Sequence, residues 1–236
     1  QYAENVYFGK PCGLMDQCAS SVGSLINIDF KDIDKPVVRK VDVDFSKFEH
    51  SLCIVDTKGS HADLTDEYAA IPAEMKKIAN YFNKEFLREV DEQEFFDNIA
   101  KVREIGNDRA VLRAIHLFTE NKRVDLQVAA LNAGDFDEFK RLIKASGDSS
   151  YKFLQNVYAN SDVFNQSVSI GLAMSEKILG DNGVCRVHGG GFAGTIQAFV
   201  KDSYVDTYKT EIEKVFGKDS CHILKVRKYG GKKVIY

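Results

Sequence analysis

The longest regular pattern in the sequence is helical and runs from about residue 74 to residue 145. Apolar side chains recur there every three or four positions, which is the spacing of one face of an α-helix. Gly134 ends one such run, and Asp135 followed three residues later by Glu138 is a capping-box start for the next. The pattern therefore predicts several amphipathic helices in the middle of the chain.

Strands are predicted on both sides of this helical block. Short apolar or alternating runs lie at 25–30, 37–45, 52–56, 184–187, 195–200, 222–226 and 233–235. Gly230 and Gly231 between the last two runs indicate a hairpin. Further helices are predicted to begin near Ile71, with Pro72 in the first turn, and at Asp162. Together these elements make up an α+β chain.

Composition narrows the class of protein without assigning a function. The chain has 236 residues, of which 44% are hydrophobic and 28% charged, and its formal net charge is −3. This charge does not favour a nucleic-acid or membrane partner. No apolar run approaches the ~20 residues of a membrane-spanning helix. The five cysteines are odd in number and show no Cys-x-x-Cys spacing, which indicates reduced thiols, no structural zinc and a cytoplasmic protein.

A carboxylate just after a turn is the main candidate for chemistry near the start of the chain. Residues 11–17 read Pro-Cys-Gly-Leu-Met-Asp-Gln. If Gly13 makes a turn that opens a helix at Asp16, the free amides and the dipole of that helix end stabilise a negative charge. Such a carboxylate can serve as a general base or an electrostatic anchor in a cleft. Asp16 can equally be an ordinary helix cap, since Asp is a preferred capping residue.

Two segments far apart in the chain carry motif-like sequences. Residues 11–17, preceded by Ala-Glu-Asn at 3–5, resemble the galactokinase signature of the GHMP sugar-kinase family. Residues 186–194, Arg-Val-His-Gly-Gly-Gly-Phe-Ala-Gly, resemble the third motif of that family, a glycine-rich turn near the C-terminus. The two segments occur in the family's order and spacing, and the resemblance extends over essentially the whole chain.

The resemblance implies an activity and a set of site residues. Galactokinases use ATP and Mg²⁺ to phosphorylate the C1 hydroxyl of galactose, which gives galactose 1-phosphate. By this resemblance Asp16 is the base or electrostatic partner of that hydroxyl, Gly13 lies against the sugar, and Tyr68 contacts a sugar hydroxyl. Glu4 aligns with the magnesium-binding acid. Two alternatives remain open, because Tyr68 can simply pack its ring and Glu4 can be a solvent-facing helix residue.

The resemblance also implies a GHMP kinase fold in two parts. Residues 1–60 would form the C-terminal part of the N-terminal catalytic domain, and residues 61–236 a ferredoxin-like C-terminal domain with extra helices. Residues 1–8 read as the tail of a helix already under way, and neither the family's Gly/Ser-rich phosphate loop nor a P-loop is present. We therefore expect a C-terminal fragment whose nucleotide loop lies upstream of Gln1 and which does not phosphorylate galactose by itself.

The glycine-rich segment has a second possible interpretation. Residues 189–194 match the dinucleotide-binding pattern Gly-x-Gly-x-x-Gly, but that pattern requires a helix to follow, and residues 195–200 read as a strand. The segment is therefore predicted to be a hairpin turn whose glycines allow positive φ and close packing against the region of Asp16. The four structural glycines are Gly189, Gly190, Gly191 and Gly194.

Three further possibilities remain open, of which the third does not conflict with kinase ancestry. Another GHMP kinase, such as one for N-acetylgalactosamine, has much the same motifs, because the residues that select the sugar lie largely upstream. A non-catalytic galactose sensor could share the fold, although the presence of Asp16 argues against it. The chain could also be a folded fragment that dimerises through an exposed sheet edge.

Overall fold

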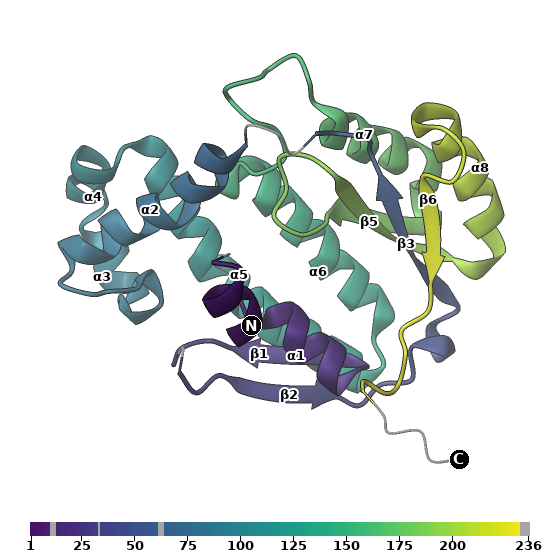
Figure 1. Cartoon of the computed structure of the whole chain (residues 1–236), viewed down its shortest axis with the longest axis horizontal. Helices are drawn as coiled ribbons and strands as arrows, with labels where there is room; N and C mark the ends of the chain where they lie inside the picture. Colours follow the sequence, from purple (N-terminus) through teal and green to yellow (C-terminus); the bar gives the residue numbers. More distant parts are fainter. Residues whose placement is uncertain (10–12, 33, 61–63, 232–236) are drawn as a thin grey trace.

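The computed structural model arranges its helices around two separate antiparallel sheets (Figure 1). The residues that it describes are 1–9, 13–32, 34–60 and 64–231. The small sheet pairs β1 (Leu25–Asp29) with β2 (Val37–Val41), and α1 (Met15–Val22) lies beside it. A π-helical turn, η1 (Ala3–Tyr7), comes before them, in agreement with the predicted end of a helix.

The larger sheet has four antiparallel strands in the order β4-β5-β3-β6. The strands are β3 (His50–Asp56), β4 (Gly183–Val187), β5 (Thr195–Lys201) and β6 (Cys221–Leu224). Along β5, Ile196, Ala198 and Val200 are fully buried in the core on one face. Phe199 belongs to a different core cluster on the other face, so the sheet is covered on both sides.

Strand β3 corrects one sequence-based assignment. The sequence predicts that residues 52–56 complete the sheet of the first domain, together with the strands at 25–30 and 37–45. In the structure β3 instead lies between β5 and β6, with Cys53 opposite both Ala198 and Ile223. The pairing is decided by partners 139 or more residues away in the sequence, which no local pattern reveals. The division at residue 60 stays a prediction.

Helices cover both faces of the larger sheet. On one face, α7 (Ser167–Leu179) and α8 (Val205–Phe216) contribute Val168, Leu179 and Ile212 to the core. On the other face, α6 (Phe136–Ser149) packs with the end of α5 (Asp108–Ala133), as Figure 1 shows. These long elements make the sheet a rigid support for the loops at its ends.

The predicted signals at the ends of the central helices are partly confirmed. Gly134 follows α5 in the left-handed conformation, and the Asp135 carboxylate accepts the Glu138 amide at 2.9 Å as α6 begins. The predicted start of a helix at Asp162 is wrong, since α7 begins at Ser167. The Asp162 carboxylate instead accepts the amides of Phe164 and Asn165 within a turn.

A helical lobe packs against the first half of α5 (Figure 1). It consists of α2 (Thr65–Tyr81), α3 (Glu92–Asp97) and α4 (Ile99–Gly106). Helix α2 begins earlier than predicted, so Pro72 lies inside the helix rather than in its first turn. As a result Tyr68 is part of the first turns of α2 rather than of a loop before it. Short helical turns are η2 (Phe45–Phe48), η3 (Leu87–Glu89), η4 (Ser150–Leu154), η5 (Gly180–Asn182) and η6 (Asp202–Tyr204).

The last described residues, which include the glycines of the predicted hairpin, run back to α1. The Gly230 amide donates to the Val22 carbonyl at 3.2 Å, and the Gly231 amide donates to the Ser21 carbonyl at 3.3 Å. Gly23 and Gly230 pack so closely that a β-carbon on Gly23 would lie 2.2 Å from the Gly230 nitrogen. The second arm of that hairpin, residues 233–235, lies outside the described residues.

Two further findings concern the cysteines and the helices. Cys18, Cys53, Cys185 and Cys221 are free thiols, and Cys12 lies outside the described residues. Within the described ranges, no helix combines the length and apolar character that crossing a membrane requires.

Candidate functional site

The glycine-rich segment is the hairpin turn that the sequence predicts. It joins β4 to β5, and the His188 amide donates to the Thr195 carbonyl at 3.1 Å where the two strands separate. Gly189, Gly191 and Gly194 have φ values of 69°, 83° and 90°, a region that side chains disfavour. We call residues 188–194 the glycine turn. Because a strand follows it, the alternative interpretation as a dinucleotide-binding loop does not hold.

Tyr68 contacts the glycine turn directly. Its hydroxyl donates to the Gly191 carbonyl at 2.8 Å. Its ring stands perpendicular to the Phe192 ring, with 5.2 Å between the centroids. A β-carbon on Gly190 would lie 2.8 Å from Tyr68 Cε1, so the ring lies close over the turn. Removal from water raises the pKa of the Tyr68 hydroxyl. Two of the segments that the sequence singles out are therefore brought together.

Asn156 holds the glycine turn through a separate set of contacts. Its side-chain Nδ2 donates to the Gly190 carbonyl at 3.1 Å, and its main-chain carbonyl accepts the Phe192 amide at 2.5 Å. Asn156 is only 4% exposed. The sequence analysis missed this residue because no motif or periodicity marks the stretch around it. Its role follows only from the contact with residues more than 30 positions later.

Thr57 fixes the end of the turn where β5 begins. Both its amide and its hydroxyl donate to the Gly194 carbonyl, at 2.7 and 2.6 Å. Thr57 is buried and directly follows β3, and its hydroxyl also lies 3.1 Å from Ser167 Oγ at the start of α7. The polar residue directly after a buried apolar strand was the signal that could have identified it. The turn is thus held by contacts from three other parts of the chain.

Asp16 lies elsewhere, in the first turn of α1. It is exposed, and Leu14 rather than Asp16 occupies the cap position. Within the described residues, the hydrogen bonds of the glycine turn to other segments involve Thr57, Tyr68 and Asn156 rather than Asp16. These hydrogen bonds therefore do not support the predicted packing of the turn against the region of Asp16.

Gly13 and Glu4 lie near Asp16 in the sequence, and Gly13 is also exposed. A β-carbon on Gly13 would meet no described atom within 4 Å, so nothing in the described protein itself requires glycine there. Glu4 is half-buried on η1. The described residues contain no group of three His, Cys, Asp or Glu side chains that could hold a metal ion. A single carboxylate can bind Mg²⁺ only together with substrate oxygens and water, so the metal-binding role of Glu4 stays a prediction.

Comparison with known proteins finds relatives that carry the same name. No protein-family model matches the chain. It is 30% identical over 208 residues to a galactokinase from Actinobacillus pleuropneumoniae, which covers 87% of this chain and 51% of the relative. A galactokinase from Streptomyces coelicolor is also 30% identical, over 92% of this chain and 53% of the relative. The chain thus spans about half the length of the curated relatives that it matches.

Solved structures show the same architecture. The crystal structure of Lactococcus lactis galactokinase complexed with galactose matches with a TM-score of 0.75 and 23% identity, over 99% of this chain and 59% of that one. The L. major mevalonate kinase in complex with R-mevalonate matches with a TM-score of 0.54 and 16% identity, over 93% of this chain and 54% of that one.

The fold, with its glycine-rich hairpin between two strands, is that of the GHMP kinases. The relatives in sequence and structure support a kinase, a class of phosphotransferase. More narrowly, the sequence relatives are galactokinases, and the match over about half of their length fits the C-terminal part of a galactokinase.

Proposed function

We propose that the chain is part of a galactokinase, which transfers the γ-phosphoryl group of ATP to the C1 hydroxyl of galactose. The observation that carries this proposal is the 30% identity to galactokinases over 87% of the chain. The fold supports it, because the same architecture occurs in a galactokinase with bound galactose. The chain spans about half the length of its relatives, and we infer galactose and ATP as the substrates of the whole protein on the same grounds.

Within this proposal Asp16 is the base or electrostatic partner of the C1 hydroxyl. Its place in the first turn of α1 supports the role, since a helix N-terminus stabilises negative charge. Its exposure leaves the carboxylate accessible to a ligand. Positioned proton transfer typically accelerates a reaction by ~10²–10⁴. Phosphoryl transfer otherwise depends mainly on positioning and charge stabilisation.

Tyr68 and Gly13 are proposed to contact the sugar. Tyr68 has a polar end that is already fixed in place, because its hydroxyl donates to the Gly191 carbonyl of the glycine turn. For Gly13 the open space around the missing side chain agrees with a position that a ligand occupies. Glu4 would supply one carboxylate to Mg²⁺, and the metal when bound would neutralise phosphate charge.

The glycine turn is proposed to bring main-chain groups close to the phosphoryl group. Gly189 and Gly190 are exposed, and within the described part of the chain no hydrogen bond occupies their amides. Free amides in a turn of this kind suit an anion. The amides of the turn would then donate to the phosphoryl group, while the Tyr68 ring covers the other side of the turn.

The experiment that tests the proposal replaces Asp16 by Asn in the protein expressed from its whole reading frame. We expect loss of galactose 1-phosphate formation by at least about 100-fold, because a positioned base is removed. The melting temperature should stay within the range of a surface substitution, since Asp16 is exposed. Turnover at the level of the unchanged protein would remove Asp16 from the mechanism.

A panel of phosphoryl acceptors decides between related kinases. Galactose, N-acetylgalactosamine and mevalonate are each supplied with ATP and Mg²⁺, and ADP release is measured. Preference for N-acetylgalactosamine would identify a sibling kinase, and no turnover with bound galactose would favour a sensor. The 236-residue chain alone is expected to give no product, since its sequence contains no phosphate-binding loop of either kind considered above.

A further inference from the structure

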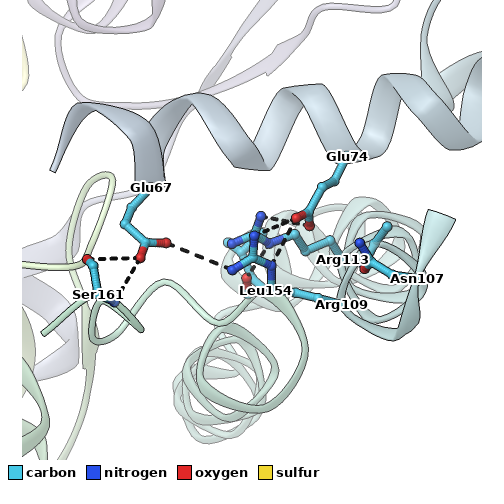
Figure 2. Close-up of polar contacts among 8 residues, drawn as sticks. Glu67, Glu74, Asn107, Arg109, Arg113, Leu154 and Ser161 are labelled. Carbon is cyan, nitrogen blue, oxygen red and sulfur yellow. Dashed lines mark hydrogen bonds and ion pairs between the residues drawn. The ribbon is translucent and has the colours of Figure 1, made fainter. Parts of the chain in front are cut away.

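A network of buried and half-buried charges joins α2 to the long helix α5. The Glu74 carboxylate on α2 accepts hydrogen bonds from Arg109 Nη2 at 2.6 Å and Nε at 2.9 Å, and from Arg113 Nη1 at 2.8 Å. Arg113 is fully buried, whereas the Arg109 side chain is 30% exposed. Figure 2 shows both guanidinium groups converging on this one carboxylate. Burial lowers the pKa of Arg113, and the charge of Glu74 opposes that effect.

Arg113 also reaches a second element. Its Nε donates to the main-chain carbonyl of Leu154 at 3.1 Å, at the end of η4 (Figure 2). Leu154 lies two residues before Asn156, which holds the glycine turn. One buried side chain therefore bonds both α2 and the start of the segment that carries Asn156. A planar guanidinium can do this because its donors point in fixed, different directions.

A second tether joins the same two elements. The Glu67 carboxylate accepts Ser161 Oγ at 3.2 Å and the Ser161 amide at 3.3 Å. It also lies 4.0 Å from Arg109 Nη1 (Figure 2). Glu67 immediately precedes Tyr68 on α2, and Ser161 lies beyond Asn156 in its segment. Helix α2 is thus held to residues 154–161 at two points, one on each side of Asn156 in the sequence.

The position of these two elements relative to each other matters at the glycine turn. Tyr68 on α2 donates to the Gly191 carbonyl, and Asn156 donates to the neighbouring Gly190 carbonyl. Both bonds can form at once only if α2 and the 154–156 segment keep their spacing. Hydrogen bonds weaken quickly beyond about 3.2 Å, so a shift of about 1 Å between the elements breaks one of them.

We propose that Arg113 is a positioning residue for the sugar site. By bonding Glu74 and the Leu154 carbonyl at once, it keeps α2 in place against residues 154–156, so that the Tyr68 hydroxyl stays on the glycine turn. Its effect on galactose rests on the proposed function, but its effect on Tyr68 and on the turn does not. Misplacement by about 1 Å at a distance from the reacting atoms can lower rates by roughly 10²-fold.

The alternative is that Arg113 serves stability alone. A buried ion pair between two helices can hold the helical lobe together without any effect on the turn. The two roles differ in what a conservative change does. Lysine keeps the positive charge but presents a compact ammonium, which does not reproduce the directed bonds to both Glu74 and Leu154.

The test compares Arg113→Lys with Arg103→Lys, which alters an exposed arginine that pairs with Asp108 on the surface. NMR on the labelled 236-residue chain follows exchange of the Phe192 amide, which donates to Asn156, and titration of the Tyr68 hydroxyl, assigned with Tyr68→Phe. In Arg113→Lys we expect Phe192 to exchange at least about tenfold faster, because its hydrogen bond opens locally. Tyr68 should titrate at lower pH, because its hydroxyl regains water.

The control Arg103→Lys should change neither signal. Unchanged exchange of Phe192 and unchanged titration of Tyr68 in folded Arg113→Lys, whatever its melting temperature, would overturn the proposal. If that variant does not fold, Glu74→Gln decides by the same two signals, because it removes the charge that holds Arg113 and keeps the side-chain shape.

Galactose affinity separates this proposal from the proposed function. It is measured by calorimetry on the protein expressed from its whole reading frame. Arg113→Lys should weaken binding by about tenfold, and the same change in a Tyr68→Phe background should have little further effect, since Arg113 acts through Tyr68. If the NMR signals move but neither variant alters galactose affinity, the positioning role stands and the sugar contact of Tyr68 fails. If Arg113→Lys weakens binding equally in both backgrounds, action through Tyr68 is refuted.

Discussion

The closest main-chain contact of the glycine turn makes Gly191→Ala the sharpest test of how the turn is held. A β-carbon on Gly191 would lie 1.9 Å from the Asn156 carbonyl oxygen and 2.7 Å from Asn156 Nδ2. Ordinary carbon contacts are about 3.5–4.0 Å, so the turn and Asn156 would have to move apart. The φ of Gly191 is also 83°, which a side chain disfavours.

The magnitude follows from two separate costs. Holding an alanine at positive φ costs roughly 1–2 kcal/mol. Forcing additional atoms into a packed region typically costs a further ~1–3 kcal/mol. We therefore expect Gly191→Ala to lower the free energy of unfolding by about 2–5 kcal/mol, a large part of the ~5–15 kcal/mol of a typical domain.

Gly189→Ala is the matched control for this prediction. Gly189 has a φ of 69°, but a β-carbon there would meet no described atom within 4 Å. It should therefore show only the backbone cost of roughly 1–2 kcal/mol. Urea unfolding at 25 °C, followed by circular dichroism, measures both variants against the unchanged chain. Equal losses for Gly189→Ala and Gly191→Ala would refute the close contact with Asn156.

Two further predictions concern single side chains. Tyr68→Phe removes the hydroxyl from the Gly191 carbonyl but keeps the ring against Phe192. The free energy of unfolding should therefore fall by about 0.5–1.5 kcal/mol. Galactose should also bind more weakly in calorimetry, and unchanged affinity would exclude the sugar contact. Burial lowers the pKa of His116, which lies beside Ser149 on α6. The unfolded chain then binds the proton more readily, so stability falls as the pH drops below about 6.5. Urea unfolding at pH 7.5 and 5.5 should show a smaller fall in His116→Gln, and an equal fall would contradict this reasoning.

Features set by neighbouring residues could be predicted from the sequence. Gly134 and Asp135 mark the junction of α5 and α6 because capping depends on residues within one turn. The hairpin at residues 188–194 was predictable because glycines lie between two apolar runs of strand character. The resemblance to GHMP kinases rested on two such local segments, and the comparisons confirm it.

Features set by distant partners could not be predicted in this way. The sheet that β3 joins is decided by β5 and β6, and its apolar run would suit either sheet. Arg113 occupies a core position that the helical pattern does not distinguish from an exposed one, because its burial depends on Glu74 in another helix. Asn156 likewise gains its role only when the chain folds back to the glycine turn.

The crossing of Gly23 and Gly230 has a consequence for the helix that carries Asp16. A side chain on Gly230 would place a carbon 2.0 Å from the Ser21 carbonyl oxygen, just as one on Gly23 would strike the Gly230 nitrogen. Neither position can therefore accept a larger residue while the crossing persists, so the two sites are expected to vary together among natural variants. The orientation of α1, near the start of the chain, thus depends on residues more than two hundred positions later.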